Sequence, residues 1–117
     1  QVVFGMEDME TVAPENLETY LSDGYELIDV REQDEWDAGH HLEAKHIPMG
    51  MIPEKINDFK TNDNYIIICR SGARSGRVSS FMKNEGLKSF NLTGGMKQLS
   101  LISEKIVDLN GNIGRVI

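Results

Sequence analysis

The single cysteine of this 117-residue chain ends an apolar run and is followed at once by basic and loop-forming residues. The run Tyr65-Ile66-Ile67-Ile68-Cys69 is short and rich in β-branched residues, which is typical of a buried strand. A loop follows, and a helix is expected from about Ser75 to Asn84. The amides of such a loop have no partners within the helix, and the helix dipole is positive at that end. The sequence therefore predicts an anion-binding strand–loop–helix unit around Cys69.

The same unit predicts the ionisation state of the thiol. Arg70, Arg74 and a helix N-terminus all favour the charged form of a cysteine, so we expect a thiolate at neutral pH. A free cysteine more often serves as a small buried hydrophobic residue, but such a residue has no need of flanking arginines. We therefore interpret Cys69 as a sulfur nucleophile.

The overall charge limits the partners of the chain. Nineteen acidic residues against twelve basic ones give a net charge of −7, which argues against nucleic acid as a partner. Arg70, Arg74 and Arg77 nevertheless cluster beside the thiol. This local reversal of charge favours a small anionic substrate.

Cysteine usage and hydropathy favour a cytoplasmic location. One cysteine cannot form an internal disulfide, which suits a reducing compartment. No apolar run is long enough to span a membrane, and the first residues lack the regions of a signal peptide. The chain begins with Gln1, which is typical of a processed product or of part of a longer polypeptide. Three histidines have no standard ligand spacing, so no metal site is expected; they are His40, His41 and His46.

Short strands and helices alternate along the chain. Strands are expected over 9–12, 25–30, 45–47, 65–69 and 89–92, and helices over 15–21, 33–38, 54–59, 75–84 and 96–100. This alternation predicts an α/β fold in which helices cover both faces of a mainly parallel sheet. Catalytic residues of such folds lie at the carboxyl ends of strands, where Cys69, Asp29 and Arg31 are found.

Five ordered segments resemble the single-domain rhodaneses, the thiosulfate sulfurtransferases. They are residues 27–32, 35–36 with 39–40, 47–48, 69–75 and 92–96. The resemblance covers roughly residues 9 to 100 and implies a rhodanese domain over 1–100 with a five-stranded sheet. Residues 101–117 are expected to be a C-terminal extension, either a hairpin around Asn110-Gly111 or a linker. The chain departs from the family at Leu99, where many members have tryptophan, and at Glu43, where glycine is common.

The resemblance implies a sulfurtransferase that needs no metal or organic cofactor. Cys69 would take sulfane sulfur from thiosulfate or a related donor, hold it as a persulfide, and pass it to cyanide or a thiol, including a protein thiol. The chemistry of the residues agrees, since Arg70 and Arg74 can pair with sulfonate oxygens while loop amides surround the outer sulfur. The substrate-binding residues are then Arg70, Ser71, Gly72, Ala73, Arg74 and Ser75, and the structural support is Asp29, Arg31 and Glu35.

Two other classes of function remain open from the sequence. Tyrosine phosphatases and arsenate reductases place five residues between cysteine and arginine, whereas four separate Cys69 from Arg74 here, which favours a smaller group. Some rhodanese-like domains are non-catalytic binding modules, usually after losing the cysteine. A persulfide carrier that serves a protein thiol differs from the enzyme only in its partner.

Overall fold

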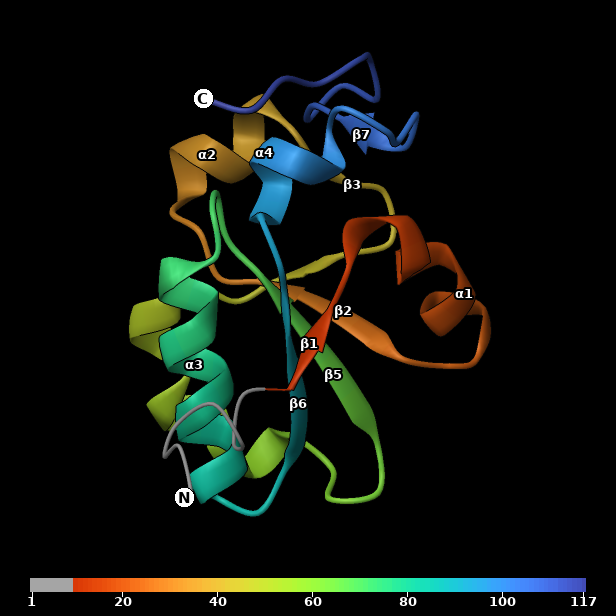
Figure 1. Ribbon diagram of the computed structural model, residues 1–117. Coiled ribbons are helices and arrows are strands. Elements are labelled where there is room, and N and C mark those ends of the chain that lie inside the picture. The colour runs from red at the N-terminus through yellow and green to blue at the C-terminus, as the bar shows by residue number, and fades with distance from the viewer. Residues whose placement is uncertain (1–9) are drawn as a thin grey trace.

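Five parallel strands form the central sheet of the computed structural model, which describes residues 10–117 (Figure 1). The strands are β1 (Thr11–Val12), β2 (Glu26–Asp29), β4 (Lys45–His46), β5 (Asn64–Ile68) and β6 (Lys88–Leu92). Their order is β1-β6-β5-β2-β4, and every neighbouring pair is parallel. The predicted α/β fold with a five-stranded parallel sheet is thus confirmed. The first expected strand began at position 9, which lies outside the described residues.

Alternating side chains of β5 build two separate cores, one on each face of the sheet. Ile66 and Ile68 belong to the first core, which also contains residues of α1 (Leu17–Ser22) and α4 (Gly95–Leu99). Ile67 and Cys69 belong to the second core, on the opposite face, which contains residues of α3 (Ala73–Asn84). Figure 1 shows α3 and α1 on opposite sides of the sheet. Burying each large aliphatic side chain contributes roughly 1.5–3 kcal/mol, so this strand anchors the fold.

Two predicted helices take a tighter form than expected. The segment expected over 15–21 is a 3₁₀-helix, η1 (Pro14–Asn16), followed by the short helix α1. The segment expected over 54–59 is the 3₁₀-helix η3 (Pro53–Asp58), preceded by η2 (Met49–Met51). Residues three apart are aligned in a 3₁₀-helix, which lets Ile56 and Phe59 pack together against the second core.

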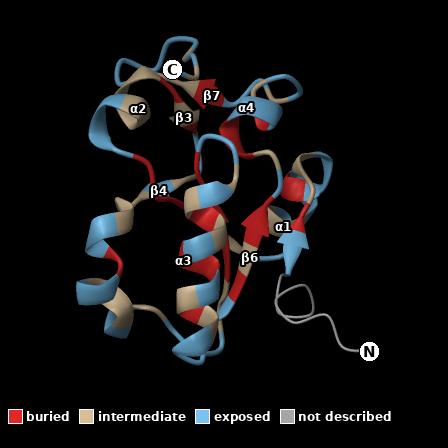
Figure 2. Cartoon of the chain, turned by 60° about the vertical axis from the view of Figure 1, so that its left-hand side comes forward, coloured by how far each residue is buried: buried red, intermediate tan, exposed pale blue. Residues whose placement is uncertain are grey.

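The C-terminal tail pairs with a distant segment as well as turning back on itself. Strand β7 (Ile106–Val107) pairs in antiparallel fashion with β3 (His40–His41), the strand that follows α2 (Gln33–Ala38). The sequence did not predict this pairing. The expected hairpin around Asn110-Gly111 is present in short form, with a bridge between Val107 and Ile113 and backbone hydrogen bonds from Asp108 to Asn112 and from Gly114 to Ile106. Ile106 is buried in the first core, and Figure 2 shows buried residues at both β3 and β7. The pairing joins residues more than 60 positions apart, which no local pattern reveals.

No helix within residues 10–117 is long and apolar enough to cross a membrane.

Candidate active site

Cys69 directly follows the central strand β5 and lies at its carboxyl end. The residue is 1% exposed, so its thiol is almost enclosed. The loop between β5 and α3 rises at the end of the molecule where α2, α4 and the C-terminus also lie (Figure 1). Helix α3 begins at Ala73, two residues earlier than expected, so the loop is short.

Hydrogen bonds from the loop and the first turn of α3 hold the cysteine sulfur. The backbone N–H of Gly72 donates to Sγ at 3.0 Å, and the hydroxyl of Ser75 lies 3.2 Å from it. Burial raises the pKa of Cys69, but the Ser75 hydroxyl and the amides of Ser75, Gly72 and Ser71 outweigh this effect and lower it overall. The pKa shift has the predicted sign. Its causes are neutral hydrogen-bond donors, whereas the sequence analysis stressed the arginines.

Two glycines make this arrangement sterically accessible. Gly72, whose N–H donates to the sulfur, adopts φ +109°, a conformation that other residues rarely adopt. A Cβ on Gly95 would lie only 2.5 Å from the carbonyl oxygen of Cys69, so only glycine allows α4 to approach. The amides of Met96 and Lys97 then bind the carbonyls of Cys69 and Arg70 at 2.8 and 2.9 Å. The start of α4 thus fixes the first two residues of the loop.

Arg74 forms a two-pronged ion pair with Glu35 of α2. Its Nη1 and Nη2 atoms lie 2.7 and 2.8 Å from the two carboxylate oxygens. The Arg74 hydrogen bond is the main cause that lowers the pKa of Glu35 to about 2, while burial opposes it. The sequence predicts that Arg74 binds a substrate anion; in this structure the anion at the guanidinium is the carboxylate of Glu35.

A second, fully buried ion pair holds α2 in place. Asp29 is the last residue of β2, and Arg31 lies two residues after it. Both are 0% exposed, and the Arg31 Nη2 atom lies 2.8 Å from the Asp29 carboxylate. The guanidinium of Arg31 also donates to the carbonyls of Glu35 and Gly39, at 3.2 and 2.7 Å. Because Glu35 in turn binds Arg74, a continuous chain of contacts leads from β2 through α2 to the cysteine loop.

The other predicted loop residues lie toward solvent. Ser71 and Ala73 are exposed, and so is Arg70, whose Nε donates to the backbone oxygen of Ile117 at 2.9 Å. Arg77 lies one turn along α3 and is also exposed. The tail therefore contacts one of the two arginines expected to bind substrate.

Asn91 of β6 is a site residue that the sequence analysis missed. Its Oδ1 lies 2.6 Å from the Ser75 hydroxyl, and its Nδ2 donates to the carbonyl of Gly72 at 3.2 Å. Asn91 pairs with Ile67 in the sheet register, and so faces α3. An asparagine inside a predicted core strand was the available signal, because asparagine is depleted in strands.

The three histidines have structural partners. His40 stacks on Trp36 with ring centroids 3.7 Å apart, and His46 also stacks on Trp36 at 4.8 Å. The ring of His41 lies 2.9 Å from the Glu18 carboxylate. Within the described part of the chain, no group of three or more His, Cys, Asp or Glu residues is placed to hold a metal ion.

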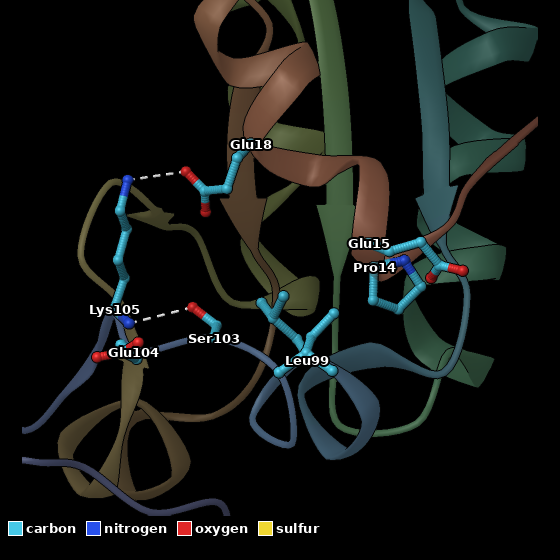
Figure 3. A pocket seen from close by; sticks show the side chains of 8 residues that line it. Pro14, Glu15, Glu18, Leu99, Ser103, Glu104 and Lys105 are labelled. Carbon is cyan, nitrogen blue, oxygen red and sulfur yellow. Dashed lines mark hydrogen bonds and ion pairs between the residues drawn. The ribbon is translucent and has the colours of Figure 1, made fainter.

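Two hollows differ in their relation to the thiol. The pocket in Figure 3, about 290 Å³, lies between η1, α1 and the segment after α4. Its floor includes Leu99, and at its edge Lys105 pairs with Glu18 at 2.8 Å. No residue of the cysteine loop lines this pocket. An open groove of about 580 Å³ instead begins at the loop itself, and its lining includes Gly72 and Arg77.

Comparison with known proteins identifies related domains. The family model of the rhodanese-like domain matches residues 13–101. The Bacillus subtilis "Putative sulfurtransferase YtwF" is 46% identical over 70 residues, which are 60% of this chain and 68% of the relative. The "Putative sulfur carrier protein YrkF" of the same organism is 38% identical over 72 residues, 61% of this chain but only 39% of the relative. A rhodanese-like domain protein from Staphylococcus aureus, known from its crystal structure, is 29% identical in sequence and superposes with a TM-score of 0.74. The superposition covers 92% of this chain and 100% of that protein's chain.

Proposed function

This chain belongs to the rhodanese-like family, and on that premise we propose that it is a sulfurtransferase that carries sulfur as a persulfide on Cys69. One observation carries the proposal: a nearly enclosed sulfur accepts hydrogen bonds from the Gly72 amide and the Ser75 hydroxyl at the start of a helix. These donors favour a thiolate, the form of cysteine that attacks sulfur. The names of related proteins, sulfurtransferase and sulfur carrier, agree with this chemistry.

In the first half-reaction, the Cys69 thiolate attacks the outer sulfur of thiosulfate or a related donor. A bond forms between Sγ and that sulfur, and the bond to the sulfonate sulfur breaks, so sulfite leaves with the electron pair. Arg74 uses two of its five N–H groups on Glu35, which leaves others for the departing anion. N–H groups that bind the departing sulfite more strongly than they bind the intact thiosulfate lower the barrier.

In the second half-reaction, an acceptor attacks the outer sulfur of the persulfide. Cyanide or a thiolate takes this sulfur, and the Cys69 thiolate leaves and is restored. The groove that begins at Gly72 offers a thiol acceptor, including one on a protein, a route to the loop. The carrier relative YrkF supports delivery to another protein as a second candidate role.

Phosphatase chemistry is not favoured. The short loop places only four residues between Cys69 and Arg74, and Cys69 is 1% exposed. A single sulfur atom needs less room than a tetrahedral phosphate. Measurable turnover of a phosphate ester would overturn this choice.

The test is the intact mass of the protein after incubation with excess thiosulfate and no reductant. We expect a gain of one sulfur atom, removal of that sulfur by cyanide, and no gain in the Cys69→Ser variant. A folded wild-type protein that gains no sulfur from thiosulfate, mercaptopyruvate or glutathione persulfide would contradict the proposal. Multiple turnovers with cyanide identify an enzyme; loading with transfer only to a protein thiol identifies a carrier.

A further inference from the structure

The hydroxyl of Ser75 has one proton and two neighbours that can accept it. The Oδ1 atom of Asn91 lies 2.6 Å from the hydroxyl oxygen, and the sulfur of Cys69 lies 3.2 Å from it. A serine hydroxyl donates only one hydrogen bond at a time. The two contacts therefore cannot both be donated by Ser75.

The orientation of the Asn91 amide removes the simplest way around this conflict. The Gly72 carbonyl can only accept, so the Nδ2 group of Asn91, 3.2 Å away, must face it. The oxygen of the amide then necessarily faces Ser75. Asn91 is 8% exposed, so water offers little replacement for a lost partner. Leaving such a buried oxygen unpaired costs free energy.

We propose that Asn91 is a positioning residue that competes with the Cys69 sulfur for the hydroxyl proton of Ser75, and so favours the sulfur-loaded protein over the empty thiolate. The part that concerns the loaded protein rests on the proposed function. The competition itself depends only on the three side chains.

The competition has a different outcome in each state of the sulfur. A thiolate can only accept, so Ser75 turns its proton to Sγ and Asn91 loses its donor. In a persulfide the negative charge lies on the outer sulfur, and Sγ becomes a neutral, weakly accepting atom. The hydroxyl proton then returns to Asn91. Only a hydroxyl rotation is involved, so no proton enters or leaves.

The charged groups around the thiol remain unchanged by substitutions at Asn91. On α3, Arg74 is paired with Glu35 of α2, and the Arg31–Asp29 pair lies at the end of β2. None of these four side chains forms a hydrogen bond with Asn91, whose partners are Ser75 and Gly72. Arg70, the remaining charge on the loop, binds the tail.

The test is the pH dependence of Cys69 alkylation by iodoacetamide, which reports one site because the chain has one cysteine. Asn91→Ala and Asn91→Leu should each lower the alkylation midpoint by about one pH unit, since Ser75 then serves the thiolate alone. The shift should vanish when either change is made in a Ser75→Ala background. An unchanged or raised midpoint in both variants overturns the proposal, as does an equal shift without the Ser75 hydroxyl.

Ser89→Ala is the matched control. Ser89 lies two residues earlier on β6, is buried, and binds Ser79 of α3, but makes no hydrogen bond with the cysteine loop. Its removal should leave the alkylation midpoint unchanged. A shift equal to that of the Asn91 variants would assign the effect to general loosening of β6 against α3 and overturn the proposal.

A second measurement follows the loaded state. At a fixed ratio of thiosulfate to sulfite and a pH above the midpoint, the ratio of loaded to empty Asn91→Ala should be about tenfold lower than in the wild type. An unchanged ratio despite a lowered midpoint would refute the effect on loading. Absence of persulfide in the wild type refutes the proposed function instead, while the alkylation result stands on its own.

Discussion

Replacing Glu35 by glutamine should separate the charge of the Glu35–Arg74 pair from its shape. The glutamine side chain has nearly the same volume and keeps one oxygen. That oxygen can still accept the hydrogen bond from the Glu32 amide, which lies 2.9 Å from the carboxylate. What disappears is the negative charge and one of the two bonds to Arg74.

The structure gives the size of the loss. The carboxyl and guanidinium side chains are 14% and 26% exposed, and the Glu35 pKa falls from 4.5 to about 2, chiefly through the hydrogen bond from Arg74 and with a smaller part from the Glu32 amide. A difference of that size corresponds to roughly 3 kcal/mol, since each pKa unit is about 1.4 kcal/mol. Partial exposure lets solvent screen the pair, so we expect Glu35→Gln to cost roughly 2 kcal/mol at pH 7.

Urea unfolding between pH 7 and pH 3 measures this cost and its pH dependence. Because the folded pKa lies below the unfolded one, the carboxylate stabilises the protein fully above pH 4.5. This stabilisation is lost as the pH falls through that value toward 2. The difference between wild type and Glu35→Gln should therefore be largest at pH 7 and narrow steadily below pH 4.5.

Asp34→Asn is the control for the change in net charge. Asp34 lies beside Glu35 in the first turn of α2, but it is exposed and forms no ion pair with a described residue. Its substitution should change stability by less than about 0.5 kcal/mol. Equal losses in the two variants, or a Glu35→Gln loss that does not shrink in acid, would refute the argument from the ion pair.

Two further substitutions test the cysteine loop and the first core. Gly72→Ala has room for its Cβ but must adopt φ +109°, so it should cost about 1–2 kcal/mol in urea unfolding. The displaced amide should also raise the alkylation midpoint of Cys69, and a lowered midpoint would contradict the assigned hydrogen bond. Leu99→Ala removes a side chain that is 2% exposed and should cost about 2–3 kcal/mol. Leu99 belongs to the first core and Cys69 to the second, so the rate of sulfur loading should not change. A slower rate in folded protein would contradict that separation.

The strand that carries the cysteine was predictable because its signal is local. Its β-branched, uninterrupted apolar residues predict a strand buried on both faces, and the structure divides them between two cores. The positive φ of Gly72 is likewise a local feature, since the tight loop into a helix requires a residue without a Cβ. Such features depend on neighbours a few residues apart.

The partners of the loop were less accessible to sequence reasoning. A cation at a helix start implies a nearby anion, and the sequence analysis assigned that anion to the substrate. In the structure Glu35, 39 residues earlier, pairs with Arg74. Nothing in the local pattern distinguishes Glu35 from the other acidic residues of its helix.

The sequence by itself determined the order of the main strands and helices, the parallel sheet and the place of Cys69 at the end of a buried strand. Hydrophobic periodicity and loop-forming residues can be recognised in a few consecutive residues, because they depend on interactions over short distances along the chain. Only the tertiary structure decided which side chains surround the sulfur loop: Glu35 on Arg74, Asn91 on Ser75, and the tail on Arg70. Those contacts arise where packing brings distant segments together, and many acidic and amide side chains compete for each such place until the fold selects one.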